Sequence, residues 1–161
     1  MDCSFEELLW DGDAIALEAN SRDFEVRVGQ MNATAEQLCD WLQHPPAVET
    51  VYYPKYTMVK SYDEIKRPGG GYGSLFSIIL RDGAQTAPRF YDALKVSKGP
   101  SLGTNFTLVC PYTLLAHFTE LDWAEDHGVS PHLVRVSAGL EAFDDLKQRF
   151  AEALDGLSVS Q

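Results

Sequence analysis

The sequence is poor in cysteine, which limits the structural bonds and metal sites it can form. Its three cysteines, Cys3, Cys39 and Cys110, are odd in number, lie far apart and form no CxxC pair. A disulfide framework or a structural zinc site typically needs paired or closely spaced cysteines. The four histidines also lack metal-ligand spacing such as His-x-x-x-His. We therefore predict reduced, mostly structural thiols and no metal site.

Basic residues are scarce as well. The chain has 13 Lys and Arg against 24 Asp and Glu, a formal net charge of −11. Nucleic acids and anionic membrane surfaces would repel such a chain. No apolar run approaches the ~20 residues of a membrane span, and the early acidic residues Asp2, Glu6 and Glu7 do not fit a signal peptide. We predict a cytoplasmic protein with neither a nucleic-acid nor a membrane partner.

Proline is absent from residues 13–44 and glycine occurs there once, which favours a long helix. A continuous helix over this range would be about 48 Å long, which exceeds the ~30 Å diameter of a small domain. Part of it should therefore overhang and contact another surface. A short turn at residues 4–10 should present further apolar side chains that need a partner. The apolar stripe of the long helix has spacings of three and four and consists of Phe24, Val28, Met31, Ala35, Leu38 and Leu42. The apolar residues of the turn are Phe5, Leu8, Leu9 and Trp10.

The remaining residues alternate between β-rich runs and amphipathic segments. With 161 residues, 45% of them hydrophobic, the chain is long enough for one compact domain plus a helical arm. About four strands with helices on one side predict an α+β two-layer sandwich. We expect a mobile polar loop at residues 55–73 and Pro88 in the first turn of its helix. The expected strands are residues 48–53, 74–80, 105–110 and 133–137, and the expected helices or helical turns are residues 86–94, 111–120, 123–127 and 141–154.

Arg135 is the strongest candidate for a functional side chain. It interrupts an otherwise apolar strand, where an unpaired guanidinium is costly. It must therefore meet either an internal acid or the anion of a ligand. Spacing alone leaves both possibilities open, the internal acids being Glu141, Asp144 and Asp145.

Other candidates are weaker. The glycines Gly69–Gly71 are not followed by Gly-Lys-Ser/Thr and precede a strand, so we do not interpret them as a phosphate loop. Cys110, beside Pro111, is interpreted as a small buried hydrophobic residue, not as a nucleophile.

Several segments together resemble a known family. They are residues 98–107 (KGPSLGTNFT), 133–141 (LVRVSAGLE), 52–56 (YYPKY), 71–77 (GYGSLFS) and 110–112 (CPY). The sequence resembles the smaller, C-terminal domain of the cystathionine gamma-synthase group of Cys/Met-metabolism pyridoxal-phosphate (PLP) enzymes, and most of all its fungal branch. The likeness extends from about Phe5 to Leu154.

The resemblance implies the small domain of the fold-type I, aminotransferase-like architecture. Residues 1–46 would form an N-terminal arm and an interdomain helix, and residues 47–161 the small domain. In this family PLP is held mainly by a larger N-terminal domain, whose Ser-x-Thr-Lys segment carries the lysine that attaches the cofactor. That segment is not found in this sequence. We therefore expect no cofactor-binding and no catalytic residues here, and no activity from this chain alone.

The resemblance also assigns substrate-binding residues. The arginine that matches Arg135 binds the α-carboxylate of the amino-acid substrate, and Ser101 and the neighbouring Leu102 would lie beside it. Without the resemblance, the sequence favours the interpretation of Ser101 as a plain turn serine. Many relatives have Gly-Gly-x-Glu-Ser where this chain has residues 103–107 (GTNFT), which leaves substrate selectivity open. Lys98 lies outside the family's cofactor motif and is predicted to be structural.

Two functions follow from these observations. In the first, the chain is the C-terminal domain of an enzyme that joins an activated homoserine ester to cysteine in transsulfuration and methionine biosynthesis. Its partner would be a PLP-binding N-terminal domain or another copy of itself. In the second, the chain is a free-standing, non-catalytic paralogue that acts through protein association.

Overall fold

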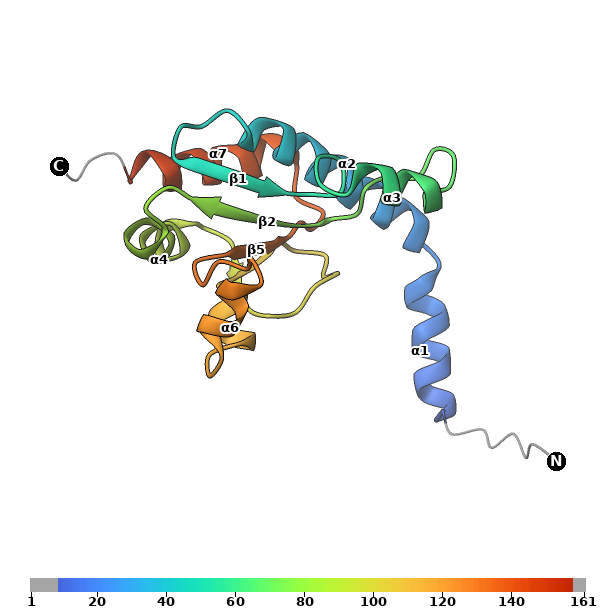
Figure 1. The fold of residues 1–161 in the computed structure, drawn as a ribbon. Helices are drawn as coiled ribbons and strands as arrows, with labels where there is room; N and C mark the ends of the chain where they lie inside the picture. The colour runs from blue at the N-terminus through green and yellow to red at the C-terminus, as the bar shows by residue number, and fades with distance from the viewer. Residues whose placement is uncertain (1–8, 158–161) are drawn as a thin grey trace.

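The computed structural model describes residues 9–157 and confirms the α+β prediction (Figure 1). Five strands form one mixed sheet in the order β1-β2-β5-β4-β3, antiparallel throughout except for the parallel β3–β4 pair. The sheet therefore has one strand more than the four or so expected, because the two-residue β3 has no sequence pattern of its own. The strands are β1 (Val48–Tyr52), β2 (Leu75–Leu80), β3 (Ser97–Lys98), β4 (Leu108–Cys110) and β5 (Val134–Ser137).

Three helices cover one face of the sheet: α2 (Phe24–Leu42), α4 (Gly83–Ala93) and α7 (Phe143–Asp155). α7 lies between the other two and contacts both (Figure 1). The helices bury one side of the strands, because alternate residues of a strand point to opposite faces. Alternate residues of β2 and β5 are accordingly fully buried in this core: Phe76, Ile78, Leu80, Val134 and Val136.

The long helix predicted for residues 13–44 is broken in the structure. α1 (Asp11–Ser21) and α2 are separate helices, and α1 extends away from the body (Figure 1). At the break, polar side chains donate hydrogen bonds to backbone carbonyls. The Ser21 hydroxyl donates to the Glu18 carbonyl at 2.8 Å, and Arg27 Nη2 donates to the Asn20 carbonyl at 2.6 Å. Such local bonds compete with helix continuation, which apolar spacing alone does not reveal.

The polar segment predicted as a mobile loop instead contains α3 (Val59–Ile65). Aromatic contacts hold this helix to the chain that follows it. The rings of Tyr62 and Tyr72 stack with centroids 5.5 Å apart, and Lys66 Nζ lies 3.7 Å from the Tyr72 centroid. These contacts order a segment whose glycine content suggested flexibility.

The remaining helices are short or shifted from their predicted positions. α5 (Tyr112–Ala116) and α6 (Leu121–Asp126) follow β4 at the positions expected. α4 begins at Gly83 and not near residue 86, so Pro88 lies inside the helix and not in its first turn. The turn predicted for residues 4–10 falls mostly outside the described residues.

Within residues 9–157, no helix combines the length and the apolar composition needed to cross a bilayer.

Candidate functional site

Arg135 lies in the middle of β5, on the sheet face opposite the helices. Its neighbours Val134 and Val136 are buried in the core on the helix side, so the alternation of the strand turns Arg135 the other way. Ser77 of β2 and Cys110 of β4 flank it in register. The guanidinium therefore rises from the centre of the sheet face that the three packed helices leave uncovered.

The guanidinium of Arg135 is held by backbone carbonyls and an aromatic ring. Nη2 donates to the Pro100 carbonyl and makes a longer, 3.5 Å contact with the Ser101 carbonyl. Its Cζ lies 4.6 Å from the ring centroid of Tyr112, which begins α5. A cation over an aromatic ring is stabilised by about 0.5–1 kcal/mol at an exposed site. Together these groups fix the plane of the guanidinium.

No acid neutralises Arg135 among the residues that the structure describes. None of the ion pairs within residues 9–157 includes it. Glu141, one of the three candidate acids, instead accepts hydrogen bonds from the Thr107 backbone N–H and hydroxyl, both at 2.8 Å. Of the two partners considered for Arg135, the internal acid is therefore not found in this part of the chain.

The loop that carries Ser101 crosses beside Arg135. The Gly99 N–H donates to the Val109 carbonyl at 3.0 Å, and the Gly103 N–H donates to the Ser137 hydroxyl at 3.1 Å. Gly103 has φ +73°, a left-handed conformation that favours glycine. Ser101 and Leu102 are both exposed at the tip of this loop. Ser101 thus meets Arg135 through its carbonyl.

A second loop is clamped against the first one. The Thr107 hydroxyl accepts a hydrogen bond from the Gly139 N–H at 3.0 Å while it donates to Glu141. Gly139 packs so closely that a Cβ there would lie 2.5 Å from the carbonyl carbon of Phe106. This contact ties the end of β5 to the start of β4, and it explains why a side chain is excluded at residue 139.

Replacing Gly139 by alanine should destabilise the fold strongly. The added methyl would overlap backbone atoms that cannot move independently, which should cost about 1–3 kcal/mol of unfolding free energy. Urea denaturation followed by circular dichroism measures this change. Gly29→Ala is the matched control: nothing lies within 4 Å of its added methyl in α2, so it should gain roughly 0.5–1 kcal/mol. Equal stability of the two variants would contradict the clamp.

Cys110 and Lys98 carry potentially reactive groups near the site, but their environments are those of structural residues. Burial raises the pKa of the Cys110 thiol, and the nearby charge and hydrogen bond of Arg135 only partly oppose it. Lys98 Nζ donates to the carbonyls of Tyr91 and Leu94, at the end of α4. A cation there stabilises the helix C-terminus. Neither residue is arranged as a nucleophile.

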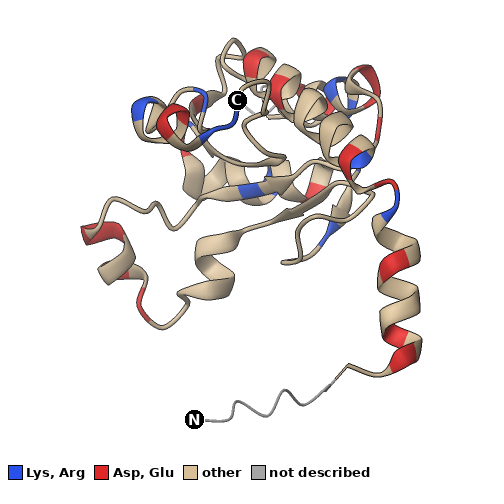
Figure 2. Ribbon diagram, turned by 90° about the vertical axis from the view of Figure 1, so that its right-hand side faces the viewer, with Lys and Arg blue, Asp and Glu red and all other residues tan. Residues whose placement is uncertain are grey.

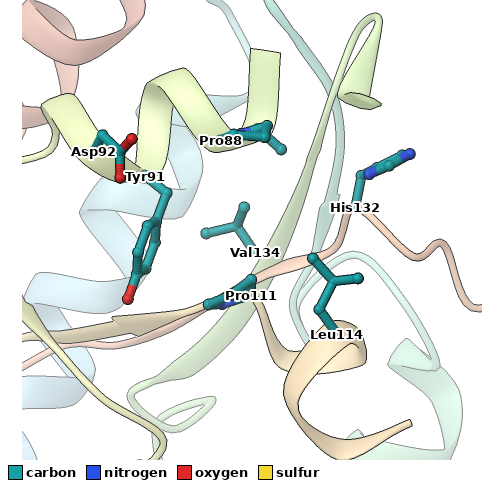
Figure 3. A pocket seen from close by; sticks show the side chains of 8 residues that line it. Pro88, Tyr91, Asp92, Pro111, Leu114, His132 and Val134 are labelled. Atoms are coloured by element: carbon teal, nitrogen blue, oxygen red, sulfur yellow. The ribbon is translucent and has the colours of Figure 1, made fainter. Parts of the chain in front are cut away.

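An apolar pocket of about 150 Å³ lies on the other side of β5 (Figure 3). Pro88 and Tyr91 of α4 form one wall, and Pro111 and Leu114 another. Val134 lines it, so the pocket opens on the helix side of the sheet, opposite Arg135. It is therefore separate from the site around the guanidinium.

The structure adds residues that the sequence did not single out. Tyr112 belongs to the segment 110–112 used for the resemblance, but its place over Arg135 depends on how α5 leaves the sheet. The Pro100 carbonyl is a backbone acceptor and leaves no mark in the residue pattern. In the sequence, the one indication of this acceptor is that Pro100 is next to the candidate residue Ser101.

The chain matches one family model and a group of curated fungal proteins. The model for Cys/Met metabolism PLP-dependent enzymes matches residues 13–155. A cystathionine gamma-synthase of Neurospora crassa is 52% identical over 150 residues, which cover 92% of this chain and 24% of that protein. A cystathionine gamma-synthase of Saccharomyces cerevisiae is 41% identical over 158 residues, 94% of this chain and 25% of that protein. The chain thus spans about a quarter of the length of these relatives.

Solved structures share the fold. An O-acetylhomoserine sulfhydrylase of Wolinella succinogenes superposes with a TM-score of 0.75 at 23% identity, over 91% of this chain and 39% of that chain. A cystathionine gamma-lyase of Lactobacillus plantarum, complexed with L-serine, has a TM-score of 0.76 at 23% identity, over 84% of this chain and 36% of that chain. At these identities the likeness establishes the fold alone.

Proposed function

The chain belongs to the family of Cys/Met metabolism PLP-dependent enzymes, and from this membership we propose that it is the C-terminal, substrate-binding part of a cystathionine gamma-synthase-like enzyme. The assembled enzyme would join an activated homoserine ester to cysteine and form cystathionine. PLP, when bound there, supplies the electron sink for this γ-replacement. The role proposed for this chain is to hold the α-carboxylate of the amino-acid substrate.

The observation that carries this proposal is the unneutralised guanidinium of Arg135. It is oriented by the Pro100 carbonyl and the Tyr112 ring, and no acid pairs with it within residues 9–157. A planar guanidinium with its position fixed can donate two parallel hydrogen bonds to a carboxylate. Ser101 and Leu102, exposed on the adjacent loop, would flank the bound amino acid.

The residues around Arg135 fit a substrate carboxylate but do not fit the cofactor. PLP needs a lysine for attachment, donors for its phosphate and a partner for its ring nitrogen. The groups gathered here are carbonyls, a phenol ring and a single guanidinium, and Lys98 of β3 is bonded to the end of α4. We propose that the cofactor is supplied by a PLP-binding N-terminal domain, with a second copy of this chain as the alternative partner.

The N-terminal arm supports a partner of this kind. No residue of α1 is buried, and Trp10, Ile15 and Leu17 are between 64% and 73% exposed. Acidic residues accompany them along α1 (Figure 2), including Asp11 and Asp13 of its first turn. We propose that this arm packs on the cofactor-binding partner.

The proposal can be tested by titrating the chain with L-homoserine and following the arginine side-chain signals by NMR. Two charge-assisted hydrogen bonds, less the cost of binding, should give a dissociation constant on the order of millimolar. L-homoserine lactone, which has no free carboxylate, is the matched ligand. We expect the Arg135 signal to move with L-homoserine and not with the lactone. Equal shifts with both ligands, or binding that survives Arg135→Ala, would contradict the proposal.

A second candidate function is protein association without catalysis, and the exposed arm is the observation that favours it. If α1 mediates self-association, Trp10→Asp should weaken it by about tenfold or more, because a charge replaces a large apolar contact. Sedimentation over a range of concentrations measures this. Phe118→Asp, an aromatic of the same 73% exposure on the α5–α6 connection, is the control. A chain that stays monomeric whether or not Trp10 is replaced would count against this candidate.

A further inference from the structure

We propose that Arg27 is a positioning residue for the carboxylate site, acting through the loop that precedes β4. This inference rests on the proposed function, because it concerns how Arg135 is kept in a binding geometry. Arg27 lies on the first turns of α2, and its three side-chain hydrogen bonds go to Asp23, Asn20 and Asn105 and not to Arg135. Its side chain joins the arm, α2 and the site loop.

Three hydrogen bonds place Arg27 at this junction. Nε donates to Asp23 Oδ1 at 2.8 Å, at the start of α2. Nη2 donates to the Asn20 carbonyl at 2.6 Å, in the last turn of α1. Nη1 donates to Asn105 Oδ1 at 3.2 Å, 78 residues further along the chain. With its side chain 25% exposed, Arg27 uses all three nitrogens of one rigid fork on three segments.

Asn105 lies at a point where the site loop is fastened. Its carbonyl accepts a hydrogen bond from the Leu140 N–H at 2.9 Å. The Leu140 carbonyl in turn accepts from Gln30 Nε2 of α2 at 2.7 Å. Arg27 and Gln30 are three residues apart and so lie on one face of the helix. This face of α2 therefore holds both loops, residues 103–107 and 138–141.

The contact between Arg27 and Asn105 can affect Arg135 through the backbone of residues 100–104. Gly103, two residues before Asn105, is held by the Ser137 hydroxyl, and Pro100 and Ser101 supply the carbonyls at the guanidinium. If the bond from Arg27 to the Asn105 side chain is lost, residues 100–104 keep the anchors at the Gly103 N–H and the Asn105 carbonyl but lose the one that ties them to α2, and they gain freedom. Disorder in the loop lets the guanidinium explore more orientations, which lowers affinity because more freedom is lost on binding. Arg27 thus couples the junction of α1 and α2 to the geometry of the carboxylate site.

The test uses the same L-homoserine titration on matched variants. Arg27→Gln and Asn105→Ala each remove the 3.2 Å bond, and we expect each to raise the dissociation constant about threefold to tenfold, the range for losing one hydrogen bond. Asn105→Asp keeps an acceptor for Arg27 and should bind like the unaltered chain. Arg22→Gln removes the same charge from a nearby arginine, directly after α1, whose ion pair is with Glu18 four residues earlier, so it should change nothing.

A second readout separates positioning from a general loss of stability. In Arg27→Gln and Asn105→Ala, amide hydrogen exchange at Gly103 and Leu140 should accelerate, whereas exchange in the core strand residues Ile78 and Val136 should not. Because Asn105 is exposed, Asn105→Ala decides the question if Arg27→Gln fails to fold. Uniformly faster exchange would overturn the inference.

The binding of L-homoserine by these variants distinguishes the carboxylate site from the role of Arg27. If Arg135→Ala leaves L-homoserine binding unchanged, the carboxylate site itself is wrong. If Arg135→Ala abolishes binding but Arg27→Gln and Asn105→Ala bind as tightly as Arg22→Gln, only the positioning role of Arg27 is wrong.

Discussion

Arg135→Ala should reduce cystathionine formation by the assembled enzyme by roughly a hundredfold to ten-thousandfold. Two charge-assisted hydrogen bonds to the substrate carboxylate, each worth about 1.5–3 kcal/mol, would be lost. Arg135→Lys should be nearly as damaging, because an ammonium cannot reproduce the planar pair of donors or the contact with the Tyr112 ring. Steady-state kinetics with varied homoserine ester measure the loss as kcat/KM.

Circular dichroism must show that the Arg135 variants remain folded. Arg22→Ala, which removes an arginine directly after α1 whose side chain is 72% exposed, is the control and should retain full activity. The carboxylate assignment would be wrong if Arg135→Lys kept the kcat/KM of the unaltered enzyme.

Phe150→Ala should lower the free energy of unfolding by about 3–5 kcal/mol. Phe150 is fully buried in α7, and its ring centroid lies 5.8 Å from that of Phe90 in α4. Truncation would remove the apolar contacts that seat α7 between the other two helices and leave a cavity in the close-packed core. Urea denaturation of the chain measures this loss.

Gln148→Ala serves as the control for Phe150, because Gln148 is exposed on the same helix and bonds only with Glu152, one turn away. Its effect should stay within about 0.5 kcal/mol. If Phe150→Ala cost no more than Gln148→Ala, the helices would not be packed on the sheet as described.

Periodicity was enough to predict the layers of this fold. The β-rich runs around Ile78 and Val136 and the stripe through Leu38 and Leu42 all point into one core, as their burial confirms. Where patterns of burial decide the structure, the sequence carries them directly. The same reasoning drew attention to Arg135, because a charge inside an apolar strand is conspicuous.

The predictions that failed or missed an element concern structure that depends on individual contacts and not on a burial pattern. The break after Ser21 follows from hydrogen bonds that Ser21 and Arg27 make to carbonyls, and α3 follows from the stacking of Tyr62 on Tyr72. The strand β3 exists only through its pairing with β4. None of these interactions has a fixed spacing that a pattern could reveal.

The site shows the same division. Arg135 was predicted from its setting and from the family resemblance, and its substrate-binding role stays a prediction. Tyr112 and Arg27 were not singled out, because their contacts join segments 23 and 78 residues apart, Tyr112 to Arg135 and Arg27 to Asn105. Residue identity shows that these groups can bind, but only the fold shows what they meet.

We propose that this chain completes the active site of a PLP enzyme. The most direct measurement is cystathionine formation from O-acetyl-L-homoserine and cysteine, with PLP present, by the chain alone, by the cofactor-binding domain of a related enzyme alone, and by the two together. We predict product only from the mixture, and its loss when the mixture contains Arg135→Ala. Product from the chain alone, or an inactive mixture of two folded and associated partners, would contradict the account.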